Sequence, residues 1–152
     1  MTDPSNVSSV GNDAAGGVER ILEGAFRFWP SKVLLTAVEL GVFTVLGDKS
    51  MTGQELGAAL RLHPRGIFDF LDALVALDFL TRDGNGPAAR YGNSPATAQF
   101  LDKNRPDYIG GLFEMASARL FRFWGDLDVA LKTGQPQNEI KNSQKSTFET
   151  LY

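Results

Sequence analysis

His63 is the only imidazole in the chain, so it is the first residue to consider for proton transfer. A histidine that acts as a general base needs an acid or a nucleophile within reach. The neighbouring residues Pro64 and Arg65 supply neither, and a proline at this point is typical of the first turn of a helix. We therefore expect His63 to serve a turn or a helix cap.

Carboxylate pairs and metal-ligating clusters supply no further candidate for catalysis or metal binding. The chain has no cysteine and one histidine, which excludes a disulfide framework, a Cys-based zinc site, a thiol nucleophile and a multi-His metal site. Asp126 and Asp128 are two positions apart on an expected helix, so their side chains diverge into solvent. We expect no catalytic residue and no metal site in this chain.

Length and composition indicate one globular domain. The chain has 152 residues, of which 43% are hydrophobic and 22% charged, with a net charge of −3. No apolar run approaches the 18 residues of a membrane span, and the N-terminus lacks the basic and apolar regions of a secretory signal. We expect a cytoplasmic protein with no membrane partner.

The chain divides into three expected regions. Residues 1–17 carry no apolar periodicity and are expected to be a disordered tail. Residues 18–134 form the folded domain, and residues 135–152 are expected to be a linker followed by the start of another helix. The first helix begins at Val18, with an apolar stripe that includes Phe26 and Trp29.

The folded region should be mainly α-helical. The apolar run 32–46 should form two helices divided at Gly41, because glycine accepts the left-handed geometry of a helix end. Thr52 and Glu55 match a capping box at the start of a helix over 52–62. A helix over 64–76 follows, and then two short strands, 79–82 and 90–93, that would form a hairpin.

The order of these elements is that of a winged helix-turn-helix fold with extra N- and C-terminal helices. A short helix should follow Ser94, and a long helix over 106–132 should bend near Gly110 and end at Gly134. Such a fold suggests DNA binding, which depends on basic side chains. The segment 64–78 carries Arg65 against three aspartates, so we expect no nucleic-acid partner.

Several segments resemble, in order, the N-terminal dimerisation domain of S-adenosylmethionine-dependent small-molecule O-methyltransferases. They are residues 28–43 (FWPSKVLLTAVELGVF), 51–57 (MTGQELG), 63–65 (HPR), 77–80 (LDFL), 91–97 (YGNSPAT) and 123–136 (FWGDLDVALKTGQP). The likeness covers about residues 20–152. It implies a homodimer, and a hydroxylated aromatic or polyketide-like natural product as the acceptor in the full-length enzyme.

The resemblance also implies a cofactor, S-adenosylmethionine, held by a catalytic domain that would follow. No strand, Gly-rich loop and helix in the required order occur in this chain, so we expect no cofactor-binding residue here. The chain would then be a fragment of a transferase and would not be an enzyme by itself.

The same resemblance supplies two groups of candidate residues. Those expected to line the lid over the acceptor are Phe113, Glu114, Met115, Arg119 and Phe123. Those expected at the dimer interface are Phe26, Trp29, Val33, Leu34, Val38, Phe121 and Trp124. Two other functions stay open: a winged-helix regulator that binds DNA or senses a ligand, and a free-standing module that pairs with a full-length methyltransferase.

Overall fold

A computed structural model describes residues 7–138, with side chains described from residue 16 onward. The chain divides after Lys32 into two compact units. The expected linker and helix start from residue 139 to the end lie outside the described residues.

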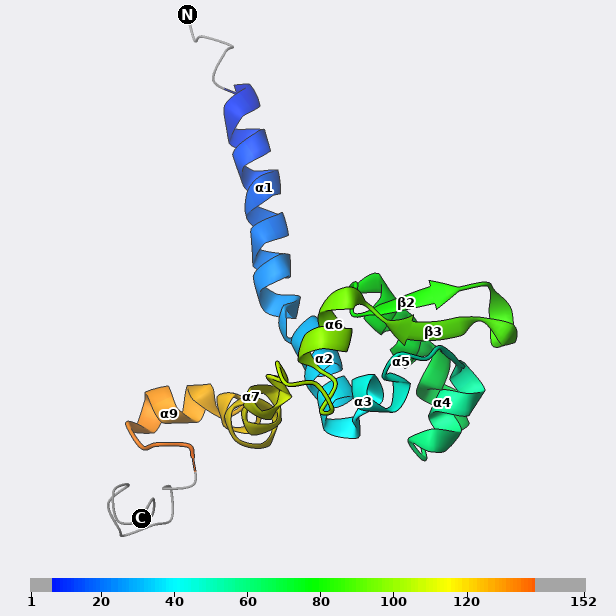
Figure 1. The fold of residues 1–152 in the computed structure, drawn as a ribbon. Coiled ribbons are helices and arrows are strands. Elements are labelled where there is room, and N and C mark those ends of the chain that lie inside the picture. The colour runs from blue at the N-terminus through cyan, green and yellow to red at the C-terminus, as the bar shows by residue number, and fades with distance from the viewer. Residues whose placement is uncertain (1–6, 139–152) are drawn as a thin grey trace, which may run out of the picture. The chain divides into compact units, whose positions relative to one another are not determined.

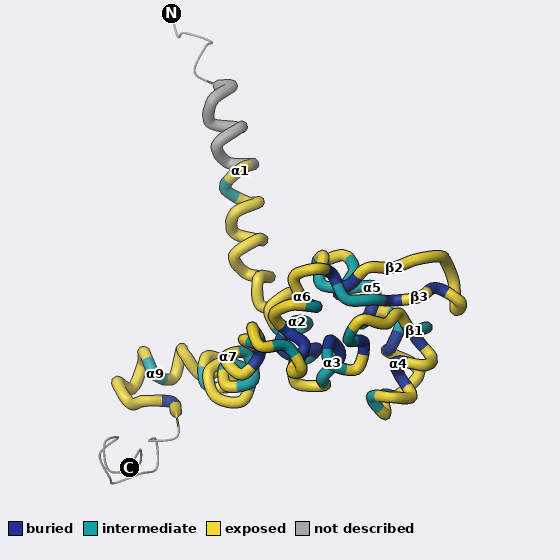
Figure 2. Tube along the Cα trace, viewed as in Figure 1, coloured by how far each residue is buried: buried dark blue, intermediate teal, exposed yellow. Residues whose placement is uncertain are grey.

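The first unit contains helix α1 (Val7–Phe26) and the start of α2 (Phe28–Leu40). Helix α1 begins eleven residues before the expected Val18, so residues 7–17 differ from the expected disordered tail. The sequence of this segment, VSSVGNDAAGG, has no helical apolar periodicity, which is why the pattern does not reveal this part of the helix. From Val18 to Phe26 most of the helix is exposed (Figure 2).

The second unit opens with the helices expected around Gly41. Helix α2 ends at Leu40, Gly41 adopts a φ of 75°, and α3 (Val42–Leu46) follows. The capping box is confirmed at α4 (Gly53–Ala59): the Thr52 hydroxyl accepts from the Glu55 amide, and the Glu55 carboxylate accepts from the Thr52 amide at 2.8 Å. Helix α4 ends three residues before the expected Leu62, because Arg61 turns to a φ of 56°.

Helix α5 (Pro64–Ala76) has the expected bounds. His63 is its N-cap, and its Nδ1 accepts a hydrogen bond from the Arg65 amide at 3.2 Å. The capping role expected for His63 is therefore confirmed.

The hairpin is also confirmed, in a slightly larger sheet (Figure 1). Strands β2 (Leu80–Asp83) and β3 (Arg90–Asn93) are antiparallel and are joined through a short 3₁₀ turn, η2 (Gly86–Ala88). A third strand that the sequence does not reveal, β1 (Met51–Thr52), pairs with the other side of β3.

The C-terminal part follows α6 (Pro95–Phe100), whose N-cap is Ser94. The expected single helix over 106–132 is wrong in detail: α7 (Gly110–Met115) leads into a π-helical segment, η3 (Ala116–Phe121), and then into α8 (Arg122–Trp124).

A separate helix, α9 (Leu127–Thr133), completes the described part of the chain. Apolar residues recur throughout the segment 106–132, both in the helices and around their breaks. The spacing of apolar residues therefore does not locate the loop before α7 or the break at Gly125-Asp126. Gly134 ends α9 with a φ of 66°, as expected.

One hydrophobic core lies within the second unit, where α2 to α5 pack with the sheet. Tyr91 is its largest fully buried side chain, and Phe43, Leu56, Leu71 and Leu74 are also fully buried. Because three of these come from the helix-turn-helix pair and one from the wing strand, the core joins both parts of the expected motif.

Candidate functional site

The aromatic residues around the junction of α1 and α2 form an exposed cluster. The ring centroids of Phe26 and Trp29 are 4.7 Å apart, and those of Phe28 and Trp29 are 5.6 Å apart in an edge-on arrangement. The rings contact one another, yet 57% of Trp29 remains accessible to solvent. An apolar cluster of this kind is typical of a protein interface.

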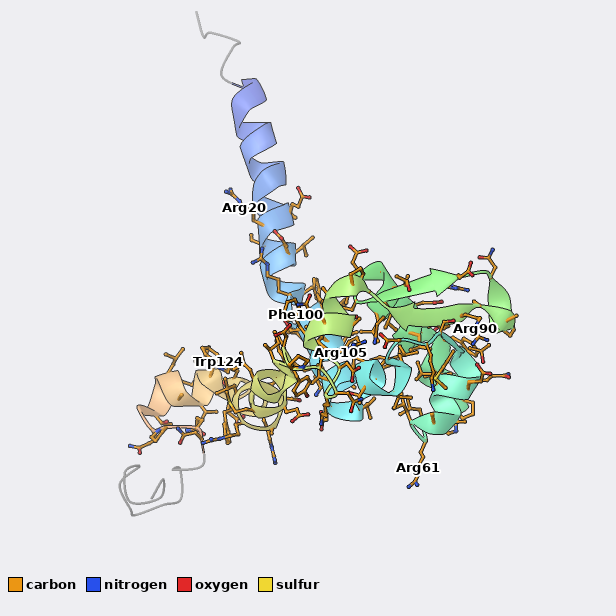
Figure 3. The ribbon with its side chains drawn as sticks, viewed as in Figure 1. Arg20, Arg61, Arg90, Phe100, Arg105 and Trp124 are labelled. Carbon is orange, nitrogen blue, oxygen red and sulfur yellow. The ribbon has the colours of Figure 1, made fainter. Side chains whose placement is uncertain are left out.

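The other expected interface residues fall into three classes. Val33 and Leu34 are half-buried and pack against the core. Val38 is only 2% exposed and belongs to the core itself, so its prediction as a surface contact is wrong in this chain. Its position on the inward face of α2, next to Ala37, explains the burial. Phe121 and Trp124 are exposed, and Figure 3 labels Trp124 on the C-terminal helices.

The expected lid residues lie along α7, η3 and α8. Phe113 is half-buried and packs against the core, whereas Met115 is exposed. Arg119 is exposed in the π-helical segment, and Phe123 is half-buried in α8. The five residues therefore share one continuous helical stretch that runs through α7, η3 and α8. Their role as a lid stays a prediction.

Glu114 is the lid candidate with defined polar contacts. Its Oε1 is 2.6 Å from the Lys103 Nζ and accepts a hydrogen bond from the Tyr108 hydroxyl at 3.1 Å. These contacts connect α7 to the loop that precedes it. Sequence reasoning missed Lys103 and Tyr108, because neither lies at a helical spacing from Glu114 that local pattern analysis would detect.

These contacts shift the pKa values of Glu114, Lys103 and Tyr108. The hydrogen bond from Lys103 is the main cause that lowers the pKa of Glu114, and the Tyr108 hydroxyl lowers it further. The pKa of Lys103 is raised by the same bond to Glu114. Burial is the main cause that raises the pKa of Tyr108, followed by its bond to Glu114. Glu114 is therefore a carboxylate at neutral pH and is held as an acceptor.

Glu114→Gln is expected to remove a pH-dependent contribution to stability. Because the folded-state pKa of Glu114 is lowered, the contribution is full above the unfolded pKa and is lost as pH falls through the folded pKa. The groups are partly exposed, so we expect at most about 1 kcal/mol at pH 7. Urea unfolding of both proteins from pH 7 to 3 measures it, and a difference that grows on acidification would contradict the assignment.

Gly110 begins α7 at a position where an added Cβ would collide with a neighbouring side chain. A Cβ there would lie 2.3 Å from the Tyr108 ring, which Glu114 holds in place. Gly110→Ala is therefore expected to cost about 1–3 kcal/mol of unfolding free energy. The double variant with Tyr108→Ala should remove this penalty, and thermal unfolding of the four proteins measures the coupling. An equal penalty in both backgrounds would show that Tyr108 is not the obstacle.

The wing uses its basic side chains for internal contacts. Arg82 Nη1 donates to Asp72 Oδ1 at 3.0 Å, and the Tyr91 hydroxyl donates to the same oxygen at 2.8 Å. Arg90 Nε donates to the Ser50 hydroxyl, and its Nη1 lies 3.8 Å from Glu55. These pairs bind the wing to α5 and α4, and both arginines of the hairpin strands have acidic neighbours.

The described residues do not fit S-adenosylmethionine. Strand β1 leads directly into the glycine-containing α-helix α4, but a Cβ at Gly53 would meet the Phe68 ring at 2.6 Å, so that space is filled by protein. Within residues 16–138 no three His, Asp or Glu side chains gather in a way that could hold a metal ion. No helix among the described residues is long and apolar enough to cross a bilayer.

The helix-turn-helix pair, its small wing and the exposed apolar helices define a winged-helix-like interaction domain. A model of the O-methyltransferase dimerisation domain matches residues 22–103. This chain therefore belongs to the O-methyltransferase dimerisation domain family.

Individual relatives agree with this family. The chain is 44% identical over 117 residues to the tetracenomycin polyketide synthesis 8-O-methyl transferase TcmO of Streptomyces glaucescens, a match that covers 77% of this chain and 34% of that protein. It is 38% identical over 116 residues to the N,N-dimethyltransferase OxyT of Streptomyces rimosus, covering 76% of this chain and 32% of that protein.

A solved structure has the same fold. Human N-acetylserotonin methyltransferase in complex with SAM superposes with a TM-score of 0.72 at 26% identity, over 78% of this chain and 35% of that one. The chain thus spans about a third of the length of the relatives it matches. None of these comparisons supports the transcription-regulator alternative.

Proposed function

We propose that this chain pairs two protomers of an S-adenosylmethionine-dependent O-methyltransferase and closes one wall of each acceptor pocket. The acceptor would be a hydroxylated aromatic or polyketide-like natural product. The observation that carries the proposal is the 44% identity to TcmO, together with the dimerisation-domain match over residues 22–103. The whole protein would draw its methyl group from S-adenosylmethionine bound outside the described residues.

The pairing role is supported by the apolar surface of α1 and α2. Exposed residues such as Ile21, Leu22, Phe26 and Trp29 would be costly to leave in water and suit an obligate contact between copies. In a twofold dimer the same surface patch of each copy lies at the interface. One exposed apolar patch on this chain is therefore enough for two copies to cover each other.

The lid role is supported by the chemistry of α7. Met115 offers a flexible, polarisable surface that adapts to flat aromatic molecules. Lys103 and Tyr108 hold Glu114, so the helix that carries Met115 has a fixed start. Such a wall would orient the acceptor hydroxyl and exclude water from the transfer step.

Nucleic-acid binding is disfavoured by the charges around the recognition helix. Arg82 and Arg90 have acidic neighbours within this chain, and Asp69 and Asp78 are exposed on or beside α5. Phosphate contacts supply most of the affinity for DNA, and here the acidic groups would oppose them.

The proposed activity is tested on the gene product that carries this chain. Labelled S-adenosylmethionine and a panel of phenolic polyketides should give methyl transfer to a phenolic oxygen. Met115→Ala should raise the KM for the acceptor about tenfold, as expected for the loss of an apolar contact with the substrate. Arg61→Ala, on the exposed turn between α4 and α5, is the control and should leave the KM unchanged. Transfer to amines alone would contradict O-methylation, and an unchanged KM would remove Met115 from the pocket.

A further inference from the structure

An apolar hollow lies between α2 and the first half of α5. Its lining includes Leu40 from α2, Gly66 and Phe70 from α5, and His63, the N-cap of α5. We call it the α2–α5 hollow. It has a volume of about 260 Å³ and is open to solvent. Leu40 is 36% exposed at this place, so apolar surface is left uncovered here by the chain itself.

Gly66 leaves the hollow open. A Cβ at this position would meet no atom within 4 Å, and the residue lies within a regular helix. A second hollow, of about 320 Å³, lies on the other side of Ile67, between α4 and α5. The first half of α5 is thus flanked by two apolar depressions that share Leu62 and Ile67.

The size of the α2–α5 hollow favours a side chain over a free ligand. Sites for drug-sized molecules usually enclose about 300–1,000 Å³ and bury most of the ligand. This hollow is smaller and more open. Protein interfaces, by contrast, are anchored by single large side chains that fill pockets of this kind.

The extent of the family match indicates which protein supplies the side chain. Residues 22–103 match a dimerisation domain, and this range contains the hollow. The same range contains exposed aromatic side chains that project from the described surface: Phe26, Phe28, Trp29 and Phe100. In a twofold dimer each copy offers both a projecting group and a receiving pocket, so the two features can satisfy each other.

We propose that the α2–α5 hollow receives an aromatic side chain from a second copy of this chain. The inference rests on the proposed pairing role and adds the place on the partner where an anchor residue binds. Leu40 and Phe70 would contact the ring of that anchor, and Gly66 would allow it to approach the backbone of α5.

Gly66→Leu tests the proposal by filling the hollow from within. The new side chain has open space and a helical backbone, so the protomer should fold as before, which far-UV circular dichroism checks. The dissociation constant of the dimer, measured by sedimentation, should rise at least about tenfold, as for loss of an interface anchor. Gly111→Leu, at an exposed helical glycine with open space in α7, outside both the hollow and α1, is the matched control and should leave the constant unchanged.

Photo-crosslinking identifies the occupant directly. Benzoylphenylalanine in place of Leu40, in a mixture of isotopically light and heavy chains, should give crosslinks between a light and a heavy chain at an aromatic residue. Crosslinks confined to one chain would show that the chain covers its own hollow and would overturn the proposal. An unchanged dimer with Gly66→Leu would also overturn it, whereas a monomeric wild-type chain would instead contradict the pairing role.

Discussion

The double substitution Phe26→Ala with Trp29→Ala is expected to convert the dimer to monomers at micromolar concentration. Each ring is large, exposed and in contact with its neighbour, as interface anchors are. Truncating an anchor of this kind costs about 2 kcal/mol or more, and each substitution occurs twice in a dimer. The dissociation constant should rise at least about 1,000-fold.

Sedimentation velocity over a concentration series measures this effect. Arg20→Ala is the control, because Arg20 is an exposed residue of the same helix and lies away from the apolar stripe by helical spacing (Figure 3). It should leave the dissociation constant within about threefold of wild type, the usual range for a surface change. A double variant that dimerises as tightly as wild type would remove the aromatic cluster from the interface.

Tyr91→Ala is expected to have the largest effect on folding. Its ring is fully buried between the helix-turn-helix pair and the wing, and its hydroxyl donates to Asp72. Removal of a large buried ring leaves a cavity and costs about 3–5 kcal/mol. That is a large part of the stability of an ordinary domain.

Tyr91→Phe separates the two contributions of this residue. It keeps the ring and removes only the hydrogen bond to Asp72, which Arg82 still contacts. We expect a loss of about 1 kcal/mol, the usual net value of such a bond. Urea unfolding at one protein concentration compares the variants. Equal losses for both substitutions would show that the hydroxyl, and not the ring, holds the wing in place.

Local signals in the sequence predict much of the second unit. The Thr52–Glu55 capping box, the His63-Pro64 start of α5 and the glycines at 41 and 134 each act through the backbone within a few residues. Such short-range chemistry is readable without the tertiary structure. All of these signals except Gly134 lie within residues 22–103, the range that the dimerisation-domain model matches.

Features that depend on contacts between residues far apart in the sequence cannot be predicted from such local signals. Strand β1 has two residues, and only pairing with β3, about forty positions later, makes it a strand. Val38 was expected at the interface from the resemblance to the dimerisation domain, and only packing shows that it faces the core.

The candidate site shows the same limit. The contact between Lys103 and Glu114 spans a loop whose course no local pattern gives. The α2–α5 hollow exists because two helices that are separated in the sequence leave a gap above Gly66. The identity of individual anchor residues therefore needs tertiary structure, whereas the expectation of a dimer interface followed from the resemblance to the dimerisation domain.

The most direct test of the central claim is the mass of this chain in solution. Sedimentation equilibrium from low to high micromolar concentration should give twice the chain mass of 16.5 kDa. The dimer should persist in high salt, because apolar contacts and not ion pairs are proposed to hold it. A single species of 16.5 kDa across that range would contradict the pairing role on which the account depends.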